Sequence, residues 1–367
     1  MEINATYEPV ELASGYNFEG NGRNTDGLSL LNIYNKVDLT SDGCDQINLL
    51  KNRDQWMGDA IEKQLTYLTR TNWRKQVTKV DSLAISNVDL KKSAELMRRW
   101  LSQDEALICE LFETYQLKGE DELGNVHFTG YYTPVIEARK KRDAQFKYPI
   151  YRYPVQWKNG TLPSREEIDG QGALAKMGLE LAWTASILDN YFMQVQGSGY
   201  LQYPNGRLEF LSYAGKNGHP YVSIGKHLVK TGAIPSKDIS LNAIKSWIVD
   251  NPDSLESLLY RNPSYVFFEN VQKAPTGASG VTLSPNHSIA VDPDVIPWGS
   301  ILLAEVPILD EQGKLENHEY RILLAQDRGS AINGAGHVDL YCGIGEFGQQ
   351  LSGSLHHYGR MWLLLPK

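Results

Sequence analysis

Two aspartates near the C-terminus are the strongest candidates for acid–base chemistry. The segment AQDRGSAINGAGHVDLYCGIGEFG, residues 325–348, reads as a buried strand ending at Asp327, a glycine-rich loop, and a second strand containing Asp339. Alternation divides this second strand into an apolar face, Val338 and Leu340, and a polar face, His337, Asp339 and Tyr341. If the apolar face meets the core, Asp339 is held on a formed strand, which is the rigid placement that a catalytic carboxyl needs.

Asp327 stands at the end of the preceding strand, so we expect it near Asp339 across a hairpin-like loop. From the residues alone, other roles stay open for both. An aspartate just before a glycine-rich loop is often part of a turn. An aspartate inside a strand is often hydrogen-bonded structure, not a catalyst.

Other catalytic motifs are missing from the sequence. It has no HExxH and no acidic cluster with metal-ligand spacing, so we expect no metal and no cofactor. GxSxG is absent, and GIGEFG lacks a following βαβ unit, which argues against a dinucleotide site. The three cysteines form no CxxC pair, and we interpret Cys109 as an unreactive, buried helix residue.

Aromatic residues gather in the middle of the chain. Half of the 20 tyrosines lie between Phe128 and Tyr221, in short segments bounded by glycine and proline. Such segments predict an antiparallel barrel or sandwich. Tyrosines are common in strands for packing reasons alone, but their faces also stack on sugar rings.

The remaining elements set the scaffold. Residues 1–48 read as loop with short strands. The apolar spacing predicts helices at 53–70, 89–103 and 105–117, and again within 222–262, while the chain from Tyr265 onward is strand-like.

Composition limits the class of protein. Of the 367 residues, 41% are hydrophobic and 22% charged, which is ordinary for a globular chain of two domains or one large one. The net charge of −8 argues against a dedicated nucleic-acid binder. No apolar run approaches the roughly 18–20 residues of a membrane helix.

From about residue 120 onward, the sequence resembles the membrane-bound lytic transglycosylase A family (MltA) of Gram-negative bacteria. The resemblance rests on these segments, in the family's order: GNVHFTGYYTPVIEAR, YPIYRYP, LPSREEI, DNYFMQVQGSGY, SYAGKNGHPYVSIGK, NPSYVFF, DRGSAINGAGHVDLYCGIG and HHYGRMWLLL.

The resemblance implies a mainly β fold with N-terminal helices. Residues 1–131 and 266–367 would form a double-psi β-barrel, called the 3D domain, together with the helices. Residues 132–265 would form an inserted β-barrel domain for substrate, with the glycan in the groove between the two domains.

The resemblance also implies an activity and its site. The family cleaves the β-1,4 bond between N-acetylmuramic acid and N-acetylglucosamine in peptidoglycan without water, and leaves 1,6-anhydro ends. The family's catalytic aspartate corresponds to Asp339, and Asp327 lies in the same site as its support. We expect glycan contacts from Tyr132, Thr133, Gln196, Gly197, Ser198, Gly199 and Tyr200.

Location and partners follow from the same resemblance. The expected partner is the glycan strand of peptidoglycan, at the periplasmic face of the outer membrane, with the protein a monomer that binds no nucleic acid. The sequence shows no signal peptide and no lipid-carrying cysteine, so we expect no membrane contact from this chain itself and a lipid anchor on the full-length protein.

Two alternatives remain at this point. A β-glycan hydrolase could use Asp327 and Asp339 as a pair, about 5–5.5 Å apart if retaining or about 6.5–9.5 Å if inverting. A non-catalytic cell-wall-binding module could use the same barrel. The aspartate pair and the aromatic segment favour an enzyme.

Overall fold

The computed structural model describes residues 33–39, 41–52, 56–69, 77–80, 83–103, 107–158, 160–272, 274–310 and 312–367. The loops and strands expected for residues 1–32 lie outside these ranges. Just after them, strand β1 (Tyr34–Val37) is followed by helix α1 (Ser41–Asn48), although residues 1–48 were expected to form loops and short strands. None of the described helices has the length and apolar character needed to cross a membrane.

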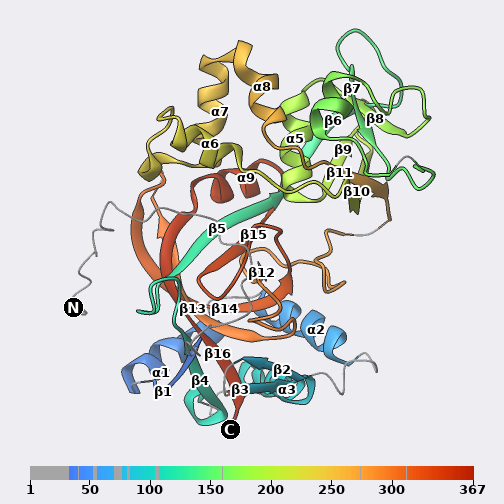
Figure 1. Cartoon of the computed structure of the whole chain (residues 1–367). Coiled ribbons are helices and arrows are strands. Elements are labelled where there is room, and N and C mark those ends of the chain that lie inside the picture. The colour runs from blue at the N-terminus through green and yellow to red at the C-terminus, as the bar shows by residue number, and fades with distance from the viewer. Residues whose placement is uncertain are drawn as a thin grey trace. The chain divides into compact units, whose positions relative to one another are not determined.

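The fold is mainly β with several helices, as expected, and its larger sheet forms the centre of Figure 1. The order of its strands is β1, β4 (Phe112–Leu117), β16 (His356–Pro366), β13 (Ile301–Leu309), β14 (Leu315–Asp327), β12 (Ser288–Ala290), β15 (His337–Ile344) and β5 (Val126–Thr133). Strand β5 also pairs with β16, so six of these strands form a closed ring.

The second sheet is formed by strands between residues 135 and 270. Its order is β11 (Val266–Asn270), β10 (Leu208–Lys216), β9 (Gly199–Gln202), β6 (Val135–Arg139), β8 (Glu180–Thr184) and β7 (Tyr148–Tyr151). A single bridge between Arg152 and Phe268 joins its two edges. Only Pro134 separates β5 from β6, so one continuous stretch of chain links the two sheets.

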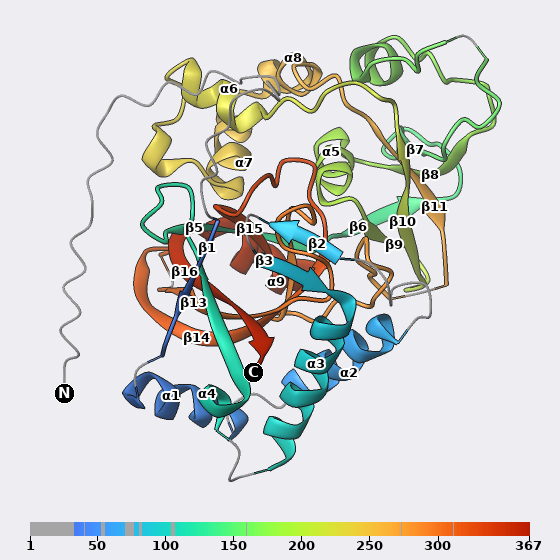
Figure 2. The same cartoon turned by 60° about the horizontal axis from the view of Figure 1, so that its bottom comes forward.

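Helices cover the larger sheet on the outside. Helix α2 (Met57–Leu68) packs against β14, and α3 (Asn87–Ser102) packs against β13 and β16, as Figure 2 shows. Consecutive residues of β13, such as Leu302 and Leu303, are fully buried, because one faces the interior of the strand ring and the next faces a helix. The hairpin of β2 (Val77–Val80) and β3 (Leu83–Ser86) precedes α3, whose start is capped by Ser86 and Asp89.

The three helices expected between residues 222 and 262 are confirmed as α6 (Ile224–Lys230), α7 (Leu241–Asp250) and α8 (Leu255–Tyr260). The helix expected at 105–117 is wrong beyond its first turn, because α4 (Ile108–Leu111) ends where β4 begins. Phe112, Thr114 and Leu117 of β4 are buried, so pairing with β16 and β1 prevails over the local helical spacing.

Two further helices were not expected, α5 (Ile187–Gln196) and α9 (Gly345–Ser354). Ser186 caps the start of α5, and Gly197 ends that helix in the left-handed conformation at φ 80°. Helix α9 contains three glycines and packs closely on β5 and β15, where a Cβ added at Gly348 would lie 2.7 Å from a backbone oxygen. Glycine is therefore required there by contact and not by helix propensity.

A disulfide joins Cys44 of α1 to Cys109 of α4, with their Cα atoms 5.9 Å apart. Cys109 was expected to be an unreactive, buried helix residue; it lies in α4 as expected, but it is half-buried and disulfide-bonded. The third cysteine, Cys342, is free and buried.

Candidate active site

The two candidate aspartates lie on either side of one residue, Ala290 of β12. Ala290 pairs with Asp327 of β14 in the parallel direction and with Asp339 of β15 in the antiparallel direction. Neighbouring strands are about 4.8 Å apart, so the two Cα atoms are separated by roughly 10 Å. We expected Asp327 to lie near Asp339 across a hairpin-like loop. This arrangement is wrong, because β12 lies between the two strands that carry the aspartates.

An irregularity in the pairing of β12 with β14 determines which side chain reaches the site. The register shifts between Ile289 and Ala290, which places Asp327, and not Gln326, opposite Ala290. Gln326 is fully buried and bonds to Ser288. Such bulges commonly redirect a side chain beside an active site.

Asp339 is half-buried and receives a hydrogen bond of 2.7 Å at Oδ1 from the hydroxyl of Thr129. Val338 and Leu340 on the opposite face are fully buried, so the expected alternation of β15 is confirmed. Burial raises the pKa of Asp339 to about 6; the Thr129 hydrogen bond opposes this rise, and the charge of Asp327 adds to it. A carboxyl with this pKa is protonated in part of the molecules near neutral pH.

Asp327 accepts more hydrogen bonds than Asp339 does. Its Oδ1 atom accepts from the backbone N–H groups of Ala278 and Arg328, each at 2.8 Å, and Oδ2 accepts from the hydroxyl of Tyr131 at 2.8 Å. Burial raises the pKa of Asp327, while these three donors favour its charged form. The indole of Trp298 also bonds to its backbone oxygen at 3.0 Å. Asp327 is therefore a fixed acceptor.

A group of histidines continues from Thr129 along β5 and β15. His337 Nε2 lies 2.9 Å from the Thr129 hydroxyl, and the His337 ring stacks on His127 with ring centres 4.9 Å apart. His127 Nε2 in turn lies 2.9 Å from His356 Nδ1. Burial lowers the pKa of His337 to about 4 and that of His127 to about 3, so these rings are neutral at neutral pH.

Thr129 and His127 were not identified from the sequence, because their role depends on the parallel pairing of β5 with β15. That pairing sets Thr129 beside Asp339 and His127 beside His337, across more than 200 residues of chain. No local pattern reports such a register. The one local signal was the GYYT segment that follows Thr129, which contains two of the expected glycan-binding residues.

Two of the expected glycan-binding residues, Thr133 and Tyr200, lie beside Tyr341. The Thr133 hydroxyl is 2.9 Å from that of Tyr341, which shares the polar face of β15 with Asp339. Burial raises the pKa of Tyr341 to about 12, and the neighbouring Tyr200 adds to that rise. Tyr200 is half-buried and packs on Phe210, with ring centres 5.1 Å apart.

Tyr132 points to the other face of β5. Its ring is buried, its hydroxyl donates to Gln349 of α9 at 3.0 Å, and its N–H bonds to Gln196 at 2.9 Å. Tyr132 lines a cavity of about 470 Å³ between α5, β6 and α9, which also presents Glu137 and Asp189. The expected residues are therefore divided between the two faces of β5.

The turn from Gln196 to Gly199 connects α5 to β9. Gly197 ends the helix, and Gly199 lies against Met193, where an added Cβ would be 2.5 Å from the sulfur. For Ser198 the structure gives no contact that assigns it a role. Tyr221, which was not among the candidates, has a raised pKa; burial is the main cause, and the charge of Asp339 adds to it.

Within the described residues, no group of three or more histidine, cysteine, aspartate or glutamate side chains is arranged to hold a metal ion. The cavity lined by Trp157 and Glu167 belongs to the long connection between β7 and β8, and not to the strands that carry the aspartates.

Comparison with known proteins gives two family matches. The family described as "MltA specific insert domain" matches residues 127–269, and the family described as "3D domain" matches residues 287–365. The membrane-bound lytic murein transglycosylase A of Escherichia coli K12 is 48% identical over 256 residues, which cover 69% of each chain. That of Vibrio cholerae is 42% identical over 277 residues, covering 74% of each chain.

A solved structure of E. coli MltA with bound chitohexaose superimposes with a TM-score of 0.71 at 38% identity. The superposition covers 84% of this chain and 90% of that one.

Proposed function

The chain belongs to the membrane-bound lytic murein transglycosylase A family, and we propose that it cleaves murein glycan strands with Asp339 as its single acid–base group. The bond broken is the β-1,4 bond between N-acetylmuramic acid and N-acetylglucosamine. The observation that carries this proposal is the environment of Asp339, a half-buried carboxyl whose pKa is raised to about 6.

The first step uses the protonated carboxyl. Asp339 donates its proton to the glycosidic oxygen, and the bond from this oxygen to C1 of the muramic sugar breaks. Positive charge develops at the ring of that sugar. The negative charge of Asp327, held by Tyr131 and two backbone N–H groups, stabilises this charge.

The second step uses the same group as a base. The C6 hydroxyl of the muramic sugar attacks C1, and the Asp339 carboxylate takes the hydroxyl proton. The product is a 1,6-anhydro ring, and Asp339 is protonated again. An intramolecular nucleophile in line with C1 has an effective concentration of up to about 10⁵–10⁸ M, so it competes well with water.

Asp327 supports this chemistry and does not activate water. Its two carboxylate oxygens accept three hydrogen bonds from fixed donors, and these bonds favour the charged form against burial, which raises its pKa. This is the reason that we prefer the single-carboxyl mechanism to hydrolysis by a pair.

For the scaffold, we propose that residues 1–131 with 266–367 form a double-psi β-barrel with its N-terminal helices. Residues 132–265 would be an inserted barrel. The closed ring of six strands and the single bridge between the edges of the second sheet support this division. The glycan would lie between the two domains, in contact with Tyr132, Thr133 and the segment 196–200.

We propose that the protein works as a monomer, held by a lipid anchor at the periplasmic face of the outer membrane. The disulfide between Cys44 and Cys109 supports an oxidising compartment, because such bonds are rare where thiols are kept reduced. The names of its relatives as membrane-bound enzymes support the anchor.

Digestion of purified murein by the native protein and by Asp339→Asn tests the proposal. The asparagine keeps the shape of the side chain and the Thr129 contact but transfers no proton, so we expect a loss of about 10²–10⁴-fold in rate. Glycan binding and the fold should persist. A rate above about a tenth of native would assign the proton transfer to another group.

A further inference from the structure

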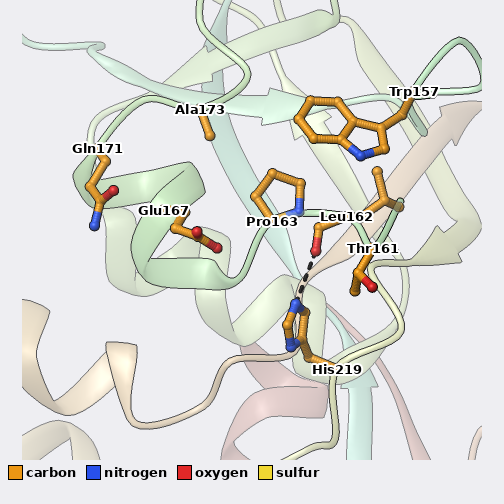
Figure 3. A pocket seen from close by; sticks show the side chains of 8 residues that line it. All are labelled: Trp157, Thr161, Leu162, Pro163, Glu167, Gln171, Ala173 and His219. Atoms are coloured by element: carbon orange, nitrogen blue, oxygen red, sulfur yellow. Dashed lines mark hydrogen bonds between the residues drawn. The ribbon is translucent and has the colours of Figure 1, made fainter. Parts of the chain in front are cut away.

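A second cavity, of about 440 Å³, lies beside the connection between β7 and β8, and no residue of β14 or β15 lines it. Figure 3 shows its lining residues. Its walls come from two separate segments: residues 157–173 and the loop after β10 that carries His219. The wall that carries Glu167 includes a π-helical turn, Glu166–Gly170. Turns of this kind are rare and are often found at functional sites.

The polar groups of this cavity have hydrogen-bonding capacity that the protein does not use. The buried indole N–H of Trp157 has no partner among the described residues. His219 Nε2 lies 2.9 Å from the carbonyl oxygen of Leu162 and must donate to it, so Nδ1 is the ring nitrogen left for a ligand.

Glu167 is similar. Its Oε2 atom accepts from the backbone N–H and the hydroxyl of Ser164, at 2.7 and 2.8 Å, and these bonds lower its pKa, with a further contribution from the charge of His219. No hydrogen bond to Oε1 is made by the part of the chain that the structure describes. In Figure 3, the carboxylate and the Trp157 indole lie on opposite sides of Pro163.

The apolar part of the lining identifies the kind of ligand. The Trp157 ring, Pro163 and Ala173 provide apolar contacts beside these donors and acceptors, and no lysine or arginine lines the cavity. The face of Trp157, with the amide of Gln171 and the carboxylate of Glu167 nearby, suits a pyranose with hydroxyl and acetamido substituents. The lining offers no lysine or arginine side chain to pair with an anionic ligand.

We propose that this cavity is a second saccharide-binding site, which takes an N-acetylated sugar of the glycan outside the catalytic groove. The inference rests on the proposed function for the identity of the sugar. A second attachment point on a polymer raises the local concentration of the strand at the groove, so it strengthens retention on murein without changing the chemistry.

Nuclear magnetic resonance of the full chain tests the site directly. The protein carries Asp339→Asn to prevent turnover and ¹⁵N-labelled tryptophan, with chitohexaose as the probe. The chain has eight tryptophans, and Trp157→Phe assigns the signal of Trp157. We expect its indole N–H signal to shift with chitohexaose. If other tryptophan signals report saturated binding while that of Trp157 stays fixed, the second site is absent.

A matched pair of variants tests the site without removing Trp157. Ala173→Phe fills the cavity, whereas Ala175→Phe adds the same ring at an exposed position two residues away. We expect Ala173→Phe to abolish the Trp157 shift and to weaken binding to murein sacculi about three- to tenfold relative to Ala175→Phe. Equal binding of the two variants overturns the inference.

The outcome is separate from that of the proposed function. Both variants should yield the same products from murein as the native protein. A reducing-end product would contradict the single-carboxyl mechanism and leave the second site intact. A Trp157 signal that stays fixed, together with anhydro products, would rule out the second site and leave the single-carboxyl mechanism intact.

Discussion

The hydroxyl of Thr129 donates a hydrogen bond of 2.7 Å to Oδ1 of Asp339 and lies 2.9 Å from Nε2 of His337. When Asp339 is charged, the Thr129 hydrogen points to it, and His337 can donate to the threonine oxygen. When Asp339 is protonated, it can donate to Thr129, whose hydrogen then turns to His337 or to the Val338 carbonyl at 3.4 Å. One hydroxyl thus serves both protonation states that the proposed mechanism needs.

Replacing Thr129 with valine should move the pH dependence of the reaction upward. The lost hydrogen bond stabilises the charged carboxylate, so its removal raises the pKa of Asp339 above about 6. The protonated acid then persists to higher pH, and the alkaline limb of kcat/KM shifts in that direction. Thr129→Ser keeps the hydroxyl and should retain the native limb. A limb that stays fixed or moves to lower pH in the valine variant contradicts this role.

Asp327→Asn should shift the same limb the opposite way. The charge of Asp327 helps to raise the pKa of Asp339, so neutralising it lowers that pKa and makes the acid lose its proton at lower pH. We also expect a slower reaction whose main product is still the anhydro sugar. The exposed Asp294, changed to asparagine, controls for net charge. If Asp327→Asn alone moves the limb upward, the two charges do not interact as described.

Asp339 should reduce stability at neutral pH. Its folded pKa of about 6 exceeds the ordinary 3.8, so the folded state binds the proton more tightly than the unfolded chain does. Stability from this group is therefore greatest below about pH 4 and declines until about pH 6. Asp339→Asn removes this loss of folding stability, which is at most about 3 kcal/mol at pH 7. Calorimetry should show a raised Tm at pH 7 and little difference near pH 4. A lowered Tm at pH 7 would count against the described environment.

Tyr200 and Tyr132 should respond differently to alanine. Tyr200 is half-buried near Tyr341, so we expect Tyr200→Ala to weaken chitohexaose binding more than stability. Tyr132 is 3% exposed, and its loss should also cost about 3–5 kcal/mol of unfolding free energy. Tyr132→Phe, which keeps the ring, isolates the hydroxyl bond to Gln349. Unchanged affinity in the folded fraction of both alanine variants would make them packing residues.

Local patterns in the sequence predicted much of what surrounds Asp339. The alternation of Val338 and Leu340 with the polar face of β15 is a property of neighbouring residues, and the structure confirms it. The helices α6, α7 and α8 also follow from the apolar spacing within residues 222–262.

Features that depend on distant pairing were not predictable in this way. Strand β12 has only three residues, yet it lies between the strands of Asp327 and Asp339 and sets their separation. The contact of Thr129 with Asp339 and the disulfide between Cys44 and Cys109 likewise join segments with no local signal. Their geometry comes from closure of the strand ring and the packing of α1 on α4.

The source of the oxygen atoms in the product tests the single-carboxyl mechanism most directly. Murein is digested in water enriched in ¹⁸O, and the released fragments are analysed by mass spectrometry. If the C6 hydroxyl is the nucleophile and Asp339 its only base, the main fragments carry a 1,6-anhydro end and contain no ¹⁸O. Fragments that carry one ¹⁸O at a reducing end as the main product would show that water attacks C1, and the reaction would then be hydrolysis with Asp327 as the second group.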